Sequence, residues 1–136
     1  MSERAVGLVV TDVGQVETRD LRVPALSVGE VKIQALYSLL SIGTEISIAT
    51  GHRMENAKFP YVPGYQGVGR IREVSEGTEG FRVGDEVLYL GGRTEEPVQA
   101  VWGAHQQTIV CGPESLIPIP SAVAPEEAAL APLFAV

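Results

Sequence analysis

The chain has 136 residues, of which 45% are hydrophobic and 20% are charged, so its composition is that of one globular domain. Its formal net charge of −7 excludes the basic surface that nucleic acid or an anionic membrane would need in a partner. The apolar stretches are too short to cross a bilayer. The single cysteine, Cys111, excludes an internal disulfide and a cysteine-based metal cage, which fits a cytoplasmic location.

The first part of the chain predicts strands. A short apolar run at residues 6–10 and an alternating segment at 16–21 flank a turn at Gly14, which is typical of a hairpin. Residues 31–38 have the period of a half-buried strand. On this pattern one face of the strand consists of Val31, Ile33, Ala35 and Tyr37.

A short helical turn is expected from Thr44 to Thr50, with Thr44 as its N-cap and Gly51 closing it. Pro60 and Pro63 then oppose regular structure. Further extended segments are predicted at 67–74, 86–91, 106–110 and 115–120, the last of them at a sheet edge because of its prolines. Short strands at this spacing favour an all-β barrel or sandwich.

The C-terminal segment predicts a helix. Pro125, Glu126 and Glu127 suit a first helical turn, and residues 128–136 would be apolar on nearly all sides. Such a helix is expected to be buried against another part of a protein, since an exposed apolar face of this size marks an interface. We therefore expect the chain to be truncated or to be one part of a larger assembly, and its apolar C-terminus could also pair two copies.

Several motifs agree in their order. They are IGTE at 42–45, FPYVPGYQGVGRIREV at 59–74, FRVGDEV at 81–87, GAHQQTIV at 103–110 and LIPIPSAVAPEEAALAPL at 116–133. Together they resemble the catalytic, GroES-like domain of the medium-chain dehydrogenase/reductase superfamily, over essentially the whole of residues 1–136. The resemblance implies a mainly β fold, a partly open β-barrel with short helices. Its C-terminal helix would lead to a Rossmann domain that binds NAD or NADP, in the same longer chain or in trans, and that is absent from residues 1–136.

The metal positions depart from the pattern of the zinc-dependent members that the chain resembles. Those members have Cys-Gly-Thr/Ser-Asp where this chain has Ile42 to Glu45, and Pro-Gly-His-Glu where it has Pro63 to Gln66. Zinc takes thiolate, imidazole or carboxylate ligands. Ile42 cannot bind zinc and Tyr65 is a poor substitute, so we expect no catalytic zinc; residues 91–103 also lack the cysteines of a structural zinc site.

Without zinc, a carbonyl oxygen must be polarised by hydrogen-bond donors. The resemblance implies that Thr44 hydrogen-bonds the substrate oxygen, although Thr44 could instead only cap the helical turn. Tyr65 could donate from its phenol or could simply line the pocket. Glu45 and Gln66 could support the site or hold the loop. The candidate catalytic residues are Thr44, Tyr65 and Glu45.

Other polar and reactive residues give weaker signals. His52 could shuttle protons or be a solvated loop residue, and His105 has no partner visible in the sequence. Cys111 is expected to be an inert thiol, in the core or at the end of a strand. The glycines at 67–69 are not a dinucleotide-binding motif, because Arg72 occupies the sixth position and no helix is predicted to follow; they more simply permit close backbone approach.

The favoured hypothesis is the substrate-side domain of a zinc-independent NAD(P)-dependent oxidoreductase. It would act on an alcohol, carbonyl or enone, a small-molecule substrate, and would be inactive without the Rossmann domain. The cofactor would not be bound by residues 1–136 alone. One alternative is a non-catalytic binding or assembly module that kept the fold. A co-chaperonin is the other, and it rests on fold kinship only.

Overall fold

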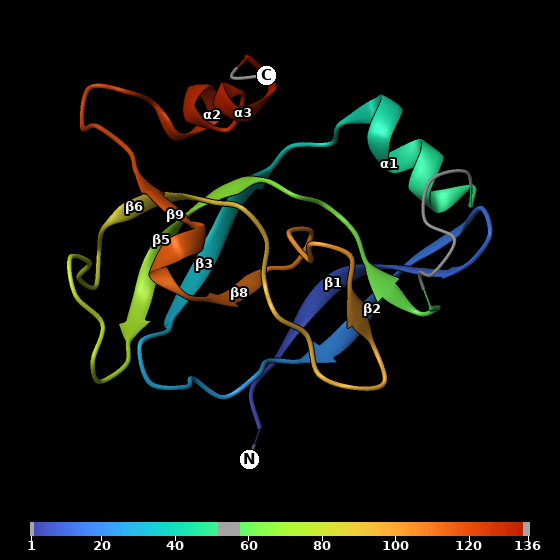
Figure 1. Ribbon diagram of the computed structural model, residues 1–136, viewed down its shortest axis with the longest axis horizontal. Coiled ribbons are helices and arrows are strands. Elements are labelled where there is room, and N and C mark those ends of the chain that lie inside the picture. The colour runs from blue at the N-terminus through green and yellow to red at the C-terminus, as the bar shows by residue number, and fades with distance from the viewer. Residues whose placement is uncertain (1, 52–57, 135–136) are drawn as a thin grey trace.

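The computed structural model describes residues 2–51 and 58–134, and it contains two β-sheets (Figure 1). In spatial order, the four-stranded sheet contains β2 (Gln15–Arg22), β1 (Arg4–Asp12), β4 (Tyr61–Val62) and β7 (Gln99–Ala100). The five-stranded sheet contains β8 (Thr108–Cys111), β3 (Val31–Ser38), β5 (Gly67–Val74), β6 (Glu86–Tyr89) and β9 (Leu116–Pro118). The helices are short: α1 (Ile42–Ala49), the 3₁₀ turn η1 (Pro113–Ser115), α2 (Pro125–Ala128) and α3 (Ala131–Phe134). The expected mainly β architecture is confirmed.

The predicted hairpin is formed by β1 and β2, which pair in antiparallel register around Gly14, a residue with a positive φ of 68°. The strand predicted at residues 31–38 is β3, with the same bounds. The prediction for Tyr37 is wrong, because the pairing of β3 with β5 shifts register between Ala35 and Tyr37. A bulge reverses the alternation of side chains, and it leaves Tyr37 51% exposed instead of buried.

Two residues between the prolines adopt regular structure, contrary to the expectation. Tyr61 and Val62 form β4, which pairs with β1 at Val10 and runs parallel to β7. A proline removes only its own N–H from a ladder, so the residues between Pro60 and Pro63 remain free to pair. Both side chains of β4 are fully buried.

Helix α1 begins two residues earlier than predicted. Its N-cap is Ser41, so Thr44 lies inside the first turn and is not the N-cap. The predicted end is confirmed, because Gly51 has a φ of 82° and its N–H donates to the carbonyl of Ile48.

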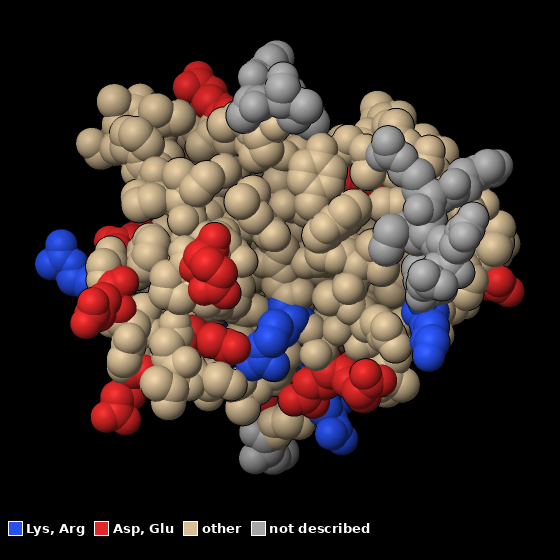
Figure 2. All heavy atoms as spheres, viewed as in Figure 1, with Lys and Arg blue, Asp and Glu red and all other residues tan. Residues whose placement is uncertain are grey.

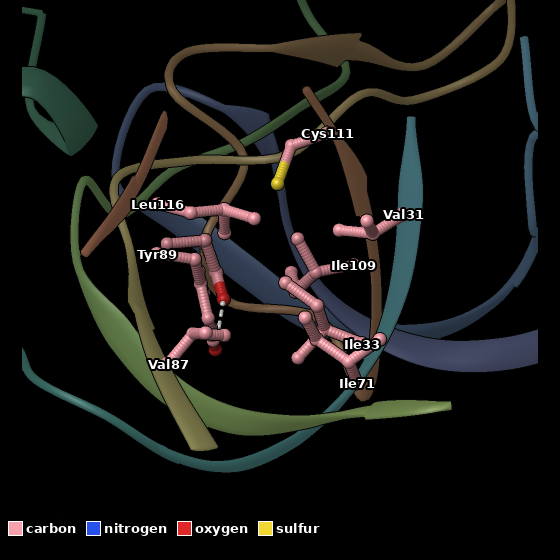
Figure 3. Close-up of a cluster of buried hydrophobic side chains, with 9 residues drawn as sticks. Val31, Ile33, Ile71, Val87, Tyr89, Ile109, Cys111 and Leu116 are labelled. Carbon is pink, nitrogen blue, oxygen red and sulfur yellow. Dashed lines mark hydrogen bonds between the residues drawn. The ribbon is translucent and has the colours of Figure 1, made fainter. Parts of the chain in front are cut away.

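The main hydrophobic core lies on the five-stranded sheet (Figure 3). Its buried members are Val31, Ile33, Ile71, Val87, Tyr89, Ala104, Ile109, Cys111 and Leu116. Burial raises the pKa of the Cys111 thiol to about 12, which agrees with the expected inert thiol. The expected close approach at the glycines is confirmed, because a Cβ at Gly67 would overlap the ring of Tyr89.

The C-terminal segment forms two short helices, α2 and α3, where the sequence predicted one continuous helix. Pro132 is the physical reason: it has no N–H for the carbonyl of Ala128, and its ring would clash with that carbonyl in a continuous helix. Ala128 and Ala129 are buried against Val68 and Leu88 of the five-stranded sheet.

Charged side chains are unevenly spread over the surface. In Figure 2 they gather on the lower half of the face shown, and the upper middle, between α1 and the α2–α3 segment, carries almost none. Within residues 2–51 and 58–134, no helix is long and apolar enough to cross a membrane.

Candidate functional site

The segment of residues 104–107 joins the two sheets. The backbone N–H of Leu8 in β1 donates to the carbonyl of His105 at 2.9 Å, and that of Ala35 in β3 donates to the carbonyl of Gln107 at 2.9 Å. We call this segment the sheet connector. It fixes the backbone of His105 at the junction of the sheets.

The ring of His105 packs on Gly64, the glycine of the PGYQ motif. Gly64 has a φ of 98°, and a Cβ built on it would lie 2.6 Å from Cδ2 of His105. The N–H of His105 donates to the carbonyl of Pro63 at 3.1 Å, and that of Ala104 donates to the carbonyl of Gly64 at 2.8 Å. Pro63 and Gly64 therefore form the surface on which the imidazole rests, and the absence of a side chain at Gly64 gives the ring its space.

Both nitrogens of His105 have side-chain partners. Nε2 is hydrogen-bonded to Oε1 of Glu45 on α1, and Nδ1 lies 2.8 Å from Oγ of Ser38 at the end of β3. Glu45 is 4% exposed and His105 is 9% exposed, whereas Ser38 is exposed. We call Ser38, His105 and Glu45 the polar array. It connects a buried carboxylate to the surface through one imidazole.

The second oxygen of Glu45 anchors the start of α1. Oε2 accepts a hydrogen bond of 2.5 Å from the backbone N–H of Ser41, the N-cap residue. This resembles a capping box, in which an acidic side chain reaches back to the N-cap backbone. An ionised carboxylate only accepts hydrogen bonds, so beside an ionised Glu45 the Nε2 atom of His105 is the donor. The protonation of the ring then decides whether Nδ1 accepts from the hydroxyl of Ser38 or donates to it.

The array lies at the wall of a cavity of about 420 Å³ that Ser38 and His105 line, a volume within the usual range for small-molecule sites. Its other walls are largely apolar, including Leu8, Leu36 and Leu40. Among the described residues that line it, there is no Lys, Arg, Asp or Glu.

A second cavity of about 240 Å³ lies next to the first and shares Leu8 and Leu40 with it. Glu45 lines this second cavity, and it is the only charged residue among the described residues there. Ser38 and His105 therefore face the first cavity, and Glu45 faces the second.

The family can now be stated from comparison with known proteins. Residues 27–121 match the family model of the alcohol dehydrogenase GroES-like domain. The chain belongs to this family. The resemblance found in the motifs is thereby confirmed.

Individual relatives agree with this assignment. Dehydrogenase pigH of Monascus ruber is 38% identical over 77 residues, which are 56% of this chain and 21% of pigH. The structure of an alcohol dehydrogenase superfamily protein from Novosphingobium aromaticivorans is similar with a TM-score of 0.78 and 25% identity, over 93% of this chain and 37% of that one. A short chain alcohol dehydrogenase, rspB, from E. coli CFT073, solved with NADH, has a TM-score of 0.74 and 25% identity, over 96% and 42%. The chain thus spans between a fifth and about two-fifths of these relatives.

The predicted site residues of this GroES-like domain lie in different places. Glu45 is in the polar array, and Thr44 precedes it in the first turn of α1, half-buried. Tyr65 packs edge-on against Trp102, with ring centroids 5.7 Å apart, and no hydrogen bond in the described part of the chain joins it to the array. Trp102 itself has a positive φ of 68°, a strained conformation for a bulky residue.

Sequence reasoning missed two members of the array, Ser38 and His105. They lie 67 positions apart, and Glu45 is 60 positions from His105, so no local spacing connects them. The available signals were a histidine where GAHQQ enters a strand and a glutamate in the first turn of a helix.

Two other candidates from the sequence lie apart from the array. Gln66 is fully buried, and its side-chain amide has no hydrogen-bond partner among the described residues. His52 lies outside the described residues.

The residues at the zinc positions of the GroES-like domain do not fit a zinc ion. Ile42 has no donor atom and is 68% exposed, and neither a phenol at Tyr65 nor an amide at Gln66 is a usual zinc ligand. Within the described ranges, no three His, Cys, Asp or Glu side chains come together as a metal site would require. A nicotinamide dinucleotide does not fit beside the glycines of β5 either. The ring of Tyr89 occupies the space beside Gly67, and the carbonyl of Gln34 occupies the space beside Gly69.

Proposed function

We propose that the chain is the substrate-side domain of a zinc-independent, NAD(P)-dependent oxidoreductase acting on an alcohol, carbonyl or enone. The observation that carries the proposal is the polar array, a buried carboxylate–imidazole pair that reaches a cavity of small-molecule size through Ser38. The names of the relatives, a dehydrogenase and an alcohol dehydrogenase solved with NADH, support the same reaction class. We place the enzyme in the cytoplasm.

In this proposal the chain binds the substrate and orients its oxygen. The cofactor, when bound by a second domain, supplies or accepts the hydride. Hydrogen-bond donors take the place of a metal ion in polarising the reacting oxygen. Thr44 and Tyr65 are the proposed donors, and Glu45 acts on the site through His105.

A second domain is part of the proposal. The glycines of β5 are buried in a sheet and leave no room for a pyrophosphate, so the cofactor must be held elsewhere. We infer that a Rossmann domain, in the same longer chain or in trans, packs beside this one. The 136-residue chain alone is then expected to be inactive.

The test combines the chain with a nucleotide-binding domain from a longer form. Oxidation of NADH and NADPH is followed with ketones, aldehydes and enones, and the metal content is measured on the same samples. We expect turnover only when both domains are present, and no stoichiometric zinc. Stoichiometric zinc would contradict the metal-free mechanism, and turnover by the 136-residue chain alone would contradict the need for a second domain.

Thr44→Ala tests the role of the threonine. Loss of a hydrogen bond to the developing oxyanion is expected to lower kcat by about 10²-fold, whereas Ser121→Ala, which removes an exposed hydroxyl from the turn after β9, should leave it unchanged. A Thr44→Ala enzyme with full turnover would show that Thr44 has no catalytic role.

A non-catalytic binding module is the second candidate. The observation that favours it is that residues of this chain alone line a cavity of about 420 Å³. Small ketones would then bind the chain with equal affinity in the presence and absence of a nucleotide-binding domain, and no combination of domains would turn them over.

A further inference from the structure

We propose that Ser38 exchanges a proton with the substrate oxygen, that His105 holds this proton, and that Glu45 is the residue that positions His105. The proposal rests on the oxidoreductase function above and adds the proton path and the class of substrate. Its basis is the geometry of the polar array, in which the three side chains form one continuous hydrogen-bonded path from a buried carboxylate to a cavity.

The direction of proton transfer follows from the hydrogen bonds. In this proposal Nε2 of His105 donates to an ionised Glu45, so that Nδ1 of the neutral ring presents its lone pair to the hydroxyl of Ser38, the two contacts that the structure shows. When an alcohol is oxidised, its O–H bond breaks and the proton passes to Oγ of Ser38, as the proton of Ser38 passes to Nδ1. An oxidised nicotinamide cofactor, held by the second domain, would accept the hydrogen of the C–H bond together with its electron pair as hydride. In the reduction of a carbonyl, the same proton returns through Ser38 to the oxygen.

The charge that this step creates is balanced inside the array. After the transfer His105 carries a proton on each nitrogen, and its positive charge lies against the carboxylate of Glu45. Both groups are more than nine-tenths buried, so this attraction is screened little by water. Oε2 of Glu45 is held by the N–H of Ser41, which fixes the carboxylate and therefore the tautomer of the ring.

A polar array of this kind gives the fold little stability. A buried ion pair recovers at best most of its desolvation cost, and apolar side chains of the same volume would serve the fold as well or better. Its presence at the cavity wall is therefore an argument for chemistry, since buried polar groups that do not stabilise the fold gather at functional sites.

The lining of the cavity restricts the substrate. Leu8, Leu36 and Leu40 form apolar walls around Ser38, and no Lys or Arg among the described lining residues would pair with an anion. A carboxylate or phosphate in this cavity would find no counter-charge among the described lining residues. The substrate is therefore an uncharged and largely apolar ketone, aldehyde or enone, or the matching alcohol.

The first experiment measures the protonation of His105 directly on the 136-residue chain, by ¹H–¹⁵N correlation spectroscopy of the imidazole nitrogens. We expect the tautomer with the proton on Nε2 and with Nδ1 as an acceptor, and a shift of the Nδ1 resonance in Ser38→Ala. A ring with its proton on Nδ1 overturns the proposal, because such a ring cannot accept the proton of Ser38.

The second experiment uses the chain together with its nucleotide-binding domain. Ser38→Ala is expected to lower kcat by about 10² to 10⁴-fold, to leave the KM for the cofactor unchanged, and to make turnover depend on the concentration of an added small acid such as imidazolium. Ser38→Thr keeps a hydroxyl and should restore most of kcat. The matched control is Ser121→Ala, an exposed serine outside the cavity.

Glu45→Gln tests the positioning role. The amide keeps the size of the side chain but not its charge, so the ring should lose its single tautomer in the spectra and kcat should fall, whereas Glu126→Gln on α2 should change neither. Wild-type kcat in Ser38→Ala would overturn the proton path alone. A wild-type pair of domains that turns over no carbonyl would overturn the proposed function and the proton path together, whatever the tautomer.

Discussion

The apolar core of the five-stranded sheet and the Glu45–His105 pair of the polar array are both buried, but they are specified in different ways. The core residues come from strands in which every second side chain points inward, such as Val31 and Ile33 in β3. The array takes one residue each from the end of a strand, a helix and the sheet connector. Local periodicity is therefore enough to specify the core, whereas the array depends on which chain segments end side by side.

The two regions also differ in energetics. Burial of Ile33 or Ile109 stabilises the fold in proportion to the apolar area removed from water. Burial of Glu45 and His105 is unfavourable unless both remain paired. The following predictions, in order of decreasing effect, test this contrast.

His105→Ala is expected to have the largest effect. It leaves the carboxylate of Glu45 buried without its partner, a change that costs about 3–5 kcal/mol in buried ion pairs. The free energy of unfolding in urea measures the loss. The double variant Glu45→Leu/His105→Leu should be less destabilised than His105→Ala, although it still loses the bond to the N–H of Ser41. A double variant that is less stable than His105→Ala would show that the pair stabilises the fold.

Ile33→Ala is the corresponding change in the apolar core. It should lower the free energy of unfolding by about 3 kcal/mol, because Ile33 is fully buried and its removal leaves a cavity. Ile117→Ala in β9 removes the same atoms from a side chain that is 49% exposed and should cost far less. Turnover of the combined domains should survive Ile33→Ala at temperatures where the variant is folded.

Gly64→Ala tests the contact between the PGYQ motif and His105. Gly84 is a matched control, because its φ of 96° is close to the 98° of Gly64, but a Cβ on Gly84 would meet no atom within 4 Å. Both substitutions place a side chain on a residue with a strained, positive φ, but only the new Cβ of Gly64→Ala overlaps the imidazole of His105. Gly64→Ala should therefore be less stable than Gly84→Ala by about 1–3 kcal/mol. Equal losses would contradict the packing of the ring on Gly64.

The smallest effect concerns the surface ion pair of Lys32 and Glu3, which lie 2.8 Å apart. The hydrogen bond from Lys32 lowers the pKa of Glu3. The contribution of the ion pair to the free energy of unfolding is therefore present above pH 4.5 and is lost as the pH falls through the lowered pKa. The same bond raises the pKa of Lys32, so the contribution is also lost as the pH rises above 10.5 through the raised value. In a plot of the free energy of unfolding against pH, Glu3→Gln should reduce the loss at the acidic end and at the basic end by less than about 1 kcal/mol each. Glu126→Gln should keep the wild-type plot.

The strands were largely predictable from the sequence because alternation is a local property. Residues 31–38 and 67–74 have the predicted bounds. Tyr37 was assigned to the wrong face because a bulge depends on pairing with β5, which the pattern of one strand does not contain. The N-cap of α1 was misplaced at Thr44, since the true N-cap, Ser41, makes no capping hydrogen bond with its side chain and is held instead by Glu45, which accepts from its N–H.

The candidate site was predictable only in part. Glu45 was identified through its motif, and Ile42 through the absence of a ligand atom. Ser38 and His105 were not, because their significance lies in contacts across 60 and 67 positions. Their roles became readable once the backbone of the sheet connector placed His105 over Gly64.

The sheet connector has a consequence for how the domain opens. Its carbonyls hold the N–H of Leu8 in one sheet and of Ala35 in the other, so neither sheet can peel away from it without breaking a bond beside His105. We therefore expect the two sheets to behave as one cooperative unit in native-state hydrogen exchange, with similar protection of the amides of Leu8 and Ala35. Separation of the sheets would then also take the polar array apart.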